Sequence, residues 1–593
     1  MRFARRRSSL YRVCSCLVIA STASAVQACE PVGAPRQATV VELPRADTVP
    51  SSAGPDTLPP ASTSDTLSSD SASTSIPAQL AELPRETVAI AYPSATRAVR
   101  VPDGADLQAA IDAAQPGDEL LLARGATYYG NFTLPDKGTS SQWIVIRSDS
   151  VVTLPSMRMT PSAAASNQLA RIVSTSDLNE SLITTAPGAH HYRFTLVEMG
   201  VTSAVTSLGA IIQFGGSDFS QTAANTAHHL IIDRAYVHGT PTTSVSRCLA
   251  LNSAQTAVID SWFADCHGNA GDSQAIAGWN GPGPFLIENN HLEGGHEVIA
   301  FGGGSFTQAD GSPSDITVRG NHITRPLAWR RTGAPGFYRP GEWQVKNLIE
   351  TKHVHRMLIE GNVLENNWND AQAGFAFVIK SENQVGDTPW TQSSDITIRY
   401  NKIRNTGNVI SLAAGPQYST RLPAARIVIS DNLVEHVNFA PFSGDGHTLQ
   451  LLGELTDIVM MHNTVTSANG NSSAVVLGQL PVVQRLVLHS NVLQHGAYGI
   501  KGGGTSEGTP SLTTYAPGSL VTHNLFVGGG EPADYPVNNY FSAGMSEVGF
   551  RDVAAEDYRL DASRYRQRGR DGRDIGADID RVELETRKAV VAP

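Results

Sequence analysis

Apolar and polar positions repeat one phrase from about residue 230 toward the C-terminus. Each copy has a β-branched run, a polar pair, an asparagine and then two or three apolar residues. The copies are FLIENNHLEGG, DITVRGNHITRP, RMLIEGNVLENN, DITIRYNKIRNT, RIVISDNLVEHV, DIVMMHNTVTSA, RLVLHSNVLQHG and SLVTHNLFVGG. Their asparagines lie between 28 and 41 residues apart. A minimum length with longer variants is typical of a solenoid, in which each repeat is one coil and insertions lengthen the loops.

The repeated asparagines predict a ladder along this solenoid. Asparagine tolerates the left-handed backbone of a tight bend, and its amide can bond the same residue one coil above and below. Two earlier phrases, HLIIDRAYVHG and TAVIDSWFADC, keep the strand pattern without the asparagine, so we expect the ladder to begin at the third phrase. We expect one axial row made of Asn290, Asn321, Asn362, Asn401, Asn432, Asn463, Asn491 and Asn524.

A short helix is predicted at the start of the folded part. Leu107, Ala110, Ile111 and Ala114 form one apolar stripe at helical spacing. Pro116-Gly117 ends that stripe, and residues 119–123 then predict a strand. The helix is therefore expected to cover the open end of the first coil.

Together these patterns predict an all-β protein, a right-handed parallel β-helix of about ten or more coils with a short N-terminal capping helix. We place this solenoid at residues 96–582. Leucine-rich repeats would need a Leu-x-x-Leu-x-Leu frame with shorter periods, and propeller blades would need longer antiparallel units. Because a solenoid grows one repeat at a time, the length of 593 residues does not require several domains.

The N-terminus indicates export. Five arginines among the first twelve residues precede the apolar run Val13 to Ala20, and small residues follow through Ala28. This order predicts a signal peptide over residues 1–28, with an apolar run too short to span a bilayer. Cleavage after Ala23-Ser24-Ala25 would release the protein, whereas Val26-Gln27-Ala28-Cys29 resembles a lipoprotein signal that acylates Cys29. The expected location is the outer membrane or cell surface as a lipoprotein, or the periplasm or medium as a released protein.

Two flanking segments are expected to lack packed structure. Residues 29–95 are rich in Pro, Ser, Thr and Ala and predict a disordered tether, which favours the acylated form of Cys29. A lipid on Cys29 is the membrane contact that we expect. Residues 583–593 predict a frayed tail.

Charge and cysteines limit the classes of partner and bond. A net charge of −11 and a pI near 5.9 exclude a nucleic-acid partner, since phosphate binding needs clustered positive charge. We expect a monomer. Cys248 and Cys266 lie in the predicted solenoid without a zinc-site spacing. Two buried free thiols are expected there, with a disulfide as the alternative.

Alignment of two strands, NLIETKHV and AFVIKSEN, brings two lysines together. If the apolar positions of both strands face inward, alternation directs Glu350, Lys352 and Lys380 outward. The two lysines then share one column on successive coils, about 5 Å apart. Like charges at that spacing need an anion or a carboxylate between them, and a lysine beside another cation is expected to have a lowered pKa. Glu350 would oppose that shift, so the net effect on the lysine pKa depends on which neighbour is closer. The alternative is a pair of solvated lysines on a flat face.

Aromatic residues and arginines gather in insertions near the same corner. The longest insertion, residues 325–346, carries Arg330 and Arg331. Aromatic faces with guanidinium groups suit anionic rings, because the ring stacks and the guanidinium bonds a carboxylate or sulfate. The alternative is that these rings fix the loops to the solenoid. The candidate rings are Trp279, Trp329, Tyr338, Trp343, Trp368 and Trp390.

The cap segment VPDGADLQAAIDAAQPGDELLLARGATYYGNFTL, the asparagine ladder and the lysine-bearing coils resemble the pectate-lyase-like superfamily, over roughly residues 95 to 580. Within it the phrase IKS at residues 379–381 is similar to the catalytic lysine phrase of the alginate and chondroitin lyase branch. The arginine-histidine-glycine phrase of that branch does not follow Lys380. The resemblance implies an exported protein whose partner is a polysaccharide.

The resemblance also implies a chemistry, β-elimination from a uronate-containing polysaccharide. Lys380 or Lys352 would remove the C5 proton, aided by an arginine such as Arg330, Arg331 or Arg319. A calcium ion or basic residues would neutralise the adjacent carboxylate. Calcium is the cofactor that this branch allows, and its ligands would be Glu350 and Glu297.

Two other functions stay open from the sequence. Glycoside hydrolysis would need two outward carboxylates about 5–9 Å apart, for which Asp272, Glu297 and Glu350 are candidates. A polysaccharide-binding or adhesive solenoid would need the binding surface without a catalytic group.

Three histidine pairs, His190-His191, His228-His229 and His353/His355, are not predicted to bind metal. Neighbouring residues of a strand face opposite sides, so only His353 and His355 are expected to share a face.

Overall fold

The computed structural model describes residues 78–590, except for 150–157, 177–179, 217–220, 270, 305–310, 384–387, 415–421, 471–472, 481 and 562. The predicted signal peptide, Cys29 and most of the predicted tether lie outside the described residues. No helix among the described residues is long and apolar enough to cross a membrane.

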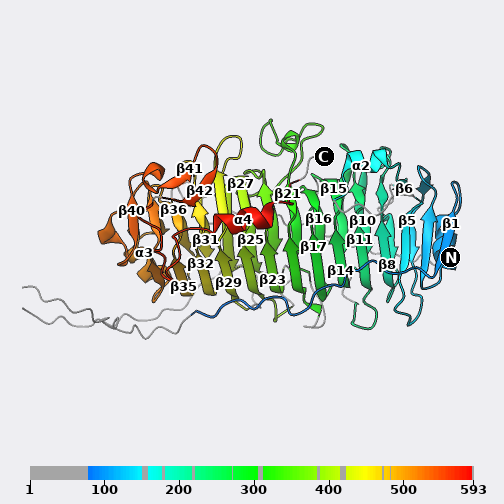
Figure 1. The fold of residues 1–593 in the computed structure, drawn as a ribbon, viewed down its shortest axis with the longest axis horizontal. Helices are drawn as coiled ribbons and strands as arrows, with labels where there is room; N and C mark the ends of the chain where they lie inside the picture. The colour runs from blue at the N-terminus through cyan, green and yellow to red at the C-terminus, as the bar shows by residue number, and fades with distance from the viewer. Residues whose placement is uncertain are drawn as a thin grey trace, which may run out of the picture. The chain divides into compact units, whose positions relative to one another are not determined.

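Three long sheets form the predicted right-handed parallel β-helix, with every neighbouring pair of strands in these sheets parallel (Figure 1). Sheet A has fourteen strands: β1 (Arg97–Val101), β2 (Asp118–Leu122), β5 (Ile144–Ser148), β8 (His190–Thr195), β11 (His228–Asp233), β14 (Ala254–Ile259), β17 (Gly283–Glu288), β20 (Ser314–Arg319), β23 (Val354–Glu360), β26 (Ser393–Arg399), β29 (Ala424–Ser430), β32 (Leu455–Met461), β35 (Gln484–His489) and β38 (Leu520–Thr522).

Sheet B also has fourteen strands: β3 (Thr127–Tyr129), β6 (Ala170–Ser174), β9 (Val197–Val201), β12 (Tyr236–His238), β15 (Trp262–Cys266), β18 (His291–Gly294), β21 (His322–Thr324), β24 (Val363–Glu365), β27 (Lys402–Thr406), β30 (Leu433–Val437), β33 (Thr464–Val465), β36 (Val492–Gln494), β39 (Leu525–Val527) and β40 (Tyr540–Ser542). Sheet C has twelve: β4 (Phe132–Leu134), β7 (Ile183–Thr185), β10 (Ser207–Phe214), β13 (Ser244–Leu251), β16 (Gln274–Gly278), β19 (Glu297–Phe301), β22 (Asn347–Thr351), β25 (Phe375–Ser381), β28 (Asn408–Ala414), β31 (Leu449–Leu452), β34 (Val475–Gly478) and β37 (Ile500–Gly502).

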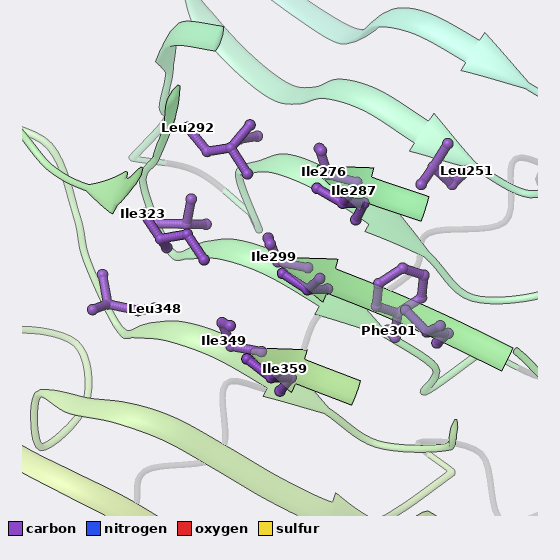
Figure 2. Close-up of a cluster of buried hydrophobic side chains, with 14 of the residues drawn as sticks. Leu251, Ile276, Ile287, Leu292, Ile299, Phe301, Ile323, Leu348, Ile349 and Ile359 are labelled. Atoms are coloured by element: carbon purple, nitrogen blue, oxygen red, sulfur yellow. The ribbon is translucent and has the colours of Figure 1, made fainter. Parts of the chain in front are cut away.

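Apolar residues stack from coil to coil inside the solenoid. On sheet C, Ile276, Ile299 and Ile349 pair in register, and all three side chains are buried (Figure 2). Each such side chain contributes about 2 kcal/mol by leaving water. The predicted capping helix is α1 (Leu107–Ala113), which buries Leu107 and Ile111 in this core. A six-residue helix, α2 (Pro161–Ser166), packs on the side, and α3 (Thr509–Tyr515) packs against β34 and β37.

The asparagine ladder is confirmed. The amide nitrogen of each asparagine from Asn290 to Asn491 donates to the side-chain oxygen of the next at 2.9–3.0 Å, and Asn524 extends the row to Asn539. The row begins at the third phrase, as expected. The backbone expectation is wrong, because the residue before each rung has the positive φ, such as Tyr400 (54°) before Asn401. The residue before the asparagine thus makes the bend, and the asparagine side chain forms hydrogen bonds with the asparagines of the neighbouring coils.

A second row of left-handed residues crosses sheet A near the start of its strands. We call it the left-handed column; its non-glycine members are His191, His229, Gln255, Asp315, Arg356, Asp395, Arg426, Asp457 and Arg485, with φ between 49° and 60°. Aspartate and arginine alternate in its last six members. Such a residue interrupts the alternation of side chains along a strand, so its side chain and its neighbour's can face the same side.

Residues 78–95, which we call the strap, lie against the outer face of sheet A, and the predicted tether boundary at residue 95 is therefore wrong. The backbone N–H groups of Gln79, Glu82 and Arg85 donate to carboxylates of the left-handed column, Asp457, Asp395 and Asp315. Val88 is buried against Ile231, Ala257, Ile259 and Leu286. The strap thus runs lengthwise along the solenoid before the chain enters β1 (Figure 1).

The C-terminal segment is also more ordered than expected. An antiparallel pair, β41 (Phe550–Asp552) and β42 (Asp557–Leu560), precedes α4 (Ile579–Thr586). Asp578 caps α4, whose Ile579 and Val582 pack on Leu433 and Tyr558. Arg158 donates to the carbonyls of Lys588 and Ala589. The prediction of a frayed tail from residue 583 is therefore wrong through Ala589, because backbone and apolar contacts hold it.

The two body cysteines form a disulfide, so the expectation of free thiols is wrong. Cys248 on β13 and Cys266 on β15 are both buried, with Cα atoms 5.5 Å apart. Their strands belong to different sheets, and both side chains point into the interior where these sheets approach each other.

Candidate functional site

Outward-facing side chains of sheet C form columns that follow the strand register. One column contains Arg247, Gln274, Glu297 and Asn347 on β13, β16, β19 and β22. The next outward column contains Ala250, Ala277, Ala300 and Glu350. The small alanine side chains leave a depression in the surface beside the first column. Glu350, on the coil after Ala300, closes one end of this depression.

Lys352 and Lys380 lie on successive coils, as the strand alignment predicted. Their ammonium groups approach one oxygen of Glu350 at 3.6 and 3.4 Å, and the Lys380 group also approaches Glu382 at 3.6 Å. The lysine side chains are 19% and 18% exposed. Glu350 therefore supplies the carboxylate that was expected between the two stacked lysines. It lies two residues before Lys352 in the sequence.

A second ionic cluster lies on the neighbouring coils. Lys346 contacts Asp272 at 2.5 Å and Glu297 at 3.6 Å, and Gln274 donates to Glu297 at 2.6 Å. Because one ammonium nitrogen contacts both carboxylates, the two oxygens that it contacts lie no more than about 6 Å apart, which excludes the widest separations of paired catalytic carboxylates. Asp272 is 39% exposed and Glu297 is 5% exposed at the side chain.

A cavity of about 240 Å³, here called the sheet-C cavity, joins these two clusters. Its polar lining includes Arg247, Asp272, Glu297, Glu350 and Lys352, and its floor includes the alanines of the second column. Trp279 forms one wall, with the Arg247 guanidinium 4.9 Å from the centre of its ring.

Glycines keep the wall beside Lys352 open. A Cβ atom on Gly303 would lie 2.7 Å from the Lys352 side chain, and one on Gly304 would lie 2.7 Å from Trp279. Gly303 also has a positive φ of 91°. The glycine run that the sequence shows after β19 thus permits close approach of the lysine and the indole to the backbone.

Three buried polar atoms at this place have no hydrogen-bond partner among the described residues. They are Nε of Arg247, Oε1 of Gln274 and Oδ1 of Asn347, all from one outward column. A buried polar atom without a partner costs about 1–3 kcal/mol. Arg247 and Gln274 line the sheet-C cavity, where a polar ligand would supply the missing partner, whereas Asn347 is not among the lining residues.

The charges around Glu350 shift pKa values in a direction that the sequence did not predict. Burial alone would raise the pKa of Glu350, but Lys380 and Lys352 outweigh it and lower that pKa to about 2. Burial would lower the pKa of Lys352, but Glu350, Glu297 and Asp272 raise it above its ordinary value. For Lys352 the neighbouring carboxylates, with Glu350 first among them, therefore decide the net shift of the pKa, which is upward and not the lowering that a second cation alone would cause.

The two carboxyls beside Lys346 differ from each other. Burial raises the pKa of Glu297, and Lys346 offsets this only in part. Burial opposes ionisation of Asp272 as well, but Lys346 outweighs it and lowers the pKa of Asp272. Two neighbouring carboxyls with pKa values moved apart can serve as an acid and an ionised partner at the same pH.

Three of the six predicted ring-contact residues are buried. Trp329, Trp343 and Trp368 pack with Val345 and Phe442, which matches the alternative that these rings fix the loops to the solenoid. These indoles are large apolar groups, and the insertion folds back to remove them from water.

The remaining three rings divide differently. Trp279 lines the sheet-C cavity. Tyr338 donates its hydroxyl to Asp370 and is half-buried. Trp390 is half-buried and does not belong to the lining of the cavity.

The predicted arginines do not line the cavity. Arg331 pairs with Asp370 at 2.9 Å and lies over the Tyr338 ring, while Arg330 is half-buried in the same insertion. Arg319 lies on sheet A with Glu288. The arginine of the cavity is Arg247. The sequence did not single it out, because β13, the strand that carries it, precedes the strands that were aligned. Lys346, the last residue of the insertion, was missed because it precedes the aligned strand.

The two carboxylates expected to hold calcium do not fit that ion. Glu350 lies between two ammonium groups, and Glu297 faces a third. Calcium needs six to eight oxygen ligands, and cations this close oppose its charge. A different group meets the geometry of a metal site among the described residues, and it consists of histidines on sheet A.

Comparisons with known proteins return matches of structure. No family model matches the chain, and no curated protein does. A PL6-family alginate lyase, AlyGC, is 13% identical with a TM-score of 0.45, covering 84% of this chain and 58% of that one. A tailspike protein of E. coli bacteriophage HK620, solved with a pentasaccharide, is 13% identical with a TM-score of 0.44, covering 72% of this chain and 62% of that one. The chain thus spans less than two thirds of either protein, and the likeness is one of solenoid fold.

Proposed function

We propose that this protein binds and cleaves an acidic polysaccharide in the sheet-C cavity, by hydrolysis of a glycosidic bond. The observation that carries the proposal is the pair Asp272 and Glu297, whose oxygens lie within about 6 Å and whose pKa values move in opposite directions. The unpartnered atoms of Arg247 and Gln274 support a polar ligand beside that pair.

The two carboxyl groups have different roles, because one is protonated and the other is ionised. Glu297, whose pKa burial raises, donates a proton to the glycosidic oxygen as the bond to the anomeric carbon breaks. Asp272, ionised beside Lys346, attacks the anomeric carbon and forms a glycosyl ester. Water then attacks this ester, gives its proton to the Glu297 carboxylate and restores both groups. A separation near 6 Å or below favours this retaining route over direct attack by water.

The charges of the lining favour a sugar with acidic groups. Arg247 and Lys352 line the cavity, and Lys380 extends the positive column one coil further. Trp279 offers a ring face against which a sugar can stack. A carboxylate or sulfate on the sugar would give the Arg247 Nε atom the acceptor that it lacks.

β-Elimination is the second candidate, and the stacked lysines favour it. Lys380 would take the C5 proton of a uronate, while protonated Lys352 would pair with the uronate carboxylate. This route needs Lys380 without its proton, and in the structure the Lys380 ammonium group is paired with Glu350 at 3.4 Å and with Glu382 at 3.6 Å. Hydrolysis does not have this requirement, so we place it first.

A substrate panel separates the candidates. The purified protein is incubated with uronate-containing and neutral polysaccharides, and reducing ends and the ultraviolet absorbance of unsaturated uronates are followed together. New reducing ends without the absorbance support hydrolysis, and both signals together support elimination. Lys380→Ala should abolish elimination and leave most of a hydrolytic activity. Binding without either product would overturn the proposal of cleavage and leave a binding solenoid.

We also propose that the chain is exported, with Cys29 as an acylated N-terminus. The support is the leader pattern alone, because these residues lie outside the described part of the chain. Mass spectrometry of the protein recovered from a bacterial host is expected to find a lipid mass on a chain that starts at Cys29. An intact Met1 would contradict export.

A further inference from the structure

Four histidines on sheet A form a compact group, the histidine cluster, made of His190, His191, His228 and His229. His190 and His228 pair in register on β8 and β11, and their rings stack at 4.7 Å. His191 and His229 stack in the same way at 4.4 Å. The expectation that consecutive histidines face opposite sides of the strand is therefore wrong here.

The backbone explains why the four rings meet. His191 and His229 belong to the left-handed column, with φ of 57° and 53°. At such a residue the alternation of side chains is interrupted, so the rings of each consecutive pair turn to one side. The Nδ1 atoms of His190 and His191 are 2.6 Å apart, and those of His228 and His229 are 2.7 Å apart.

Hydrogen bonding fixes which nitrogens carry lone pairs. The Nε2 atom of His190 lies 2.5 Å from the carbonyl oxygen of Gly138, which can only accept, so this nitrogen carries the proton. Its Nδ1 is then bare and faces the N–H of His191. A backbone carbonyl that orients one imidazole nitrogen is the support that metal-binding histidines commonly have.

Asp136 lies beside the histidine cluster, with a carboxylate oxygen 3.8 Å from Nε2 of His190, and places a negative charge there. Trp143 lies against the side of His191 at 5.1 Å and shields it from solvent.

We infer that the histidine cluster binds one transition-metal dication with a preference for imidazole, such as Zn²⁺. Ligand nitrogens of His190, His191 and His228 already lie within 4.8 Å of one another. His229 completes a set of four, the number that a closed tetrahedral zinc site uses. Nitrogens about 2 Å from a tetrahedral metal lie roughly 3.3 Å apart, so each close Nδ1 pair needs to open by less than about 1 Å. The proton between the two Nδ1 atoms of each pair, which His191 carries in the first pair, has to move to Nε2 of the ring that holds it before both Nδ1 atoms can bind the metal.

The position of the cluster gives this metal a structural role. It lies on sheet A and would join two successive coils beside the loop that holds Gly138. The sheet-C cavity is lined by other residues. Metal binding here and cleavage in the sheet-C cavity are therefore independent, and each can fail without the other.

The test measures binding to the whole purified protein after treatment with a chelator. Titration with Co²⁺ should give the visible absorption of a tetrahedral nitrogen site and saturate at one equivalent, and Zn²⁺ should displace it. Zn²⁺ should also raise the thermal midpoint with increasing concentration, because it binds the folded state alone.

Two variants make the assignment specific. His190→Ala combined with His228→Ala should weaken Zn²⁺ binding by more than about 100-fold, since half of the ligands are removed. His238→Ala is the matched control, because His238 lies on β12 of the same coil and bonds Glu198 and Gly239 instead. Circular dichroism of the metal-free proteins checks folding. Wild-type protein that gives no one-equivalent Co²⁺ signal, or equal loss in the control, would overturn the inference.

Discussion

Two rows of stacked charges run along this solenoid, and they differ in how the charges are paired. On sheet A, Asp315, Asp395 and Asp457 each accept two hydrogen bonds of 2.6–2.8 Å from one arginine of the next coil. The three arginines are Arg356, Arg426 and Arg485. Backbone N–H groups of the strap donate further hydrogen bonds to the same three carboxylates. On sheet C, by contrast, Glu350 is shared between two lysines at 3.4–3.6 Å, and Lys346 is shared between two carboxylates.

Under the proposed function, this difference separates a structural row from a catalytic one. In the sheet-A row each of Asp315, Asp395 and Asp457 has its own arginine, and these bonds outweigh burial, so the pKa values of all three fall. On sheet C the partners are shared and a cavity remains, so the pKa of Glu297 rises while that of Asp272 falls. We therefore assign the proposed catalysis to the row in which the pairing is unequal and a cavity gives a ligand access.

The largest expected effect is on activity and comes from the sheet-C row. Glu297→Gln should lower kcat about a thousandfold, because an amide cannot donate the proton that the leaving oxygen needs. The thermal midpoint at pH 7 should not fall, since a buried carboxyl with a raised pKa does not stabilise the folded state there. Steady-state kinetics and a thermal melt measure the two quantities. Glu288→Gln, on sheet A of the same coil, is the control and should keep full activity.

An intermediate effect is expected on stability and comes from the sheet-A row. Asp395→Ala removes both bonds from Arg426 and the bond from the Glu82 N–H, which leaves a half-buried guanidinium without its partner. The free energy of unfolding should fall by about 2 kcal/mol, with kcat unchanged. Urea unfolding and kinetics check this. Glu82→Ala keeps the backbone N–H and should change little; a loss of activity in Asp395→Ala would erase the distinction between the two rows.

The smallest expected effect is a difference in pH response. The pKa values of Asp315, Asp395 and Asp457 are lowered in the folded state, so their stabilisation is complete above the unfolded value near 4 and is lost as pH falls through the folded values. Glu297 has a raised pKa and opposes this trend, because its charged form costs stability above that value. Amide exchange should show the strap N–H groups of Gln79, Glu82 and Arg85 losing protection between about pH 5 and pH 2. Unchanged protection across that range would contradict the role given to the aspartates.

Much of the fold could be predicted because the relevant signals are periodic. Alternation within strands placed Lys352 and Lys380 outward, and equal phrases placed Asn321 above Asn362. The left-handed column could not be predicted, because residues such as Arg356 and Gln255 do not favour a positive φ and are held there by neighbouring coils. The histidine cluster depends on that column, and it was missed for this reason.

Other misses have a different cause. The strap binds sheet A through backbone N–H groups, which every residue except proline carries. The side chains of the strap therefore do not indicate that it binds there. Trp329 and Trp343 are surface-loop residues by sequence, and only the way the insertion folds back shows that they are buried. Burial of a loop residue depends on contacts between distant segments, which no local pattern records.

The strap has a consequence for the time course of synthesis. Gln79 bonds Asp457, which follows it by 378 residues, so at ordinary rates of translation roughly 20 to 75 s pass before the partner exists. Throughout that interval the N–H group of Gln79 is without the carboxylate that it bonds in the folded chain. Each of its three aspartate partners is made later than the one before, from Asp315 to Asp457. Docking of the strap therefore proceeds toward its own N-terminus, and the last bond forms only in a chain whose late coils have been completed.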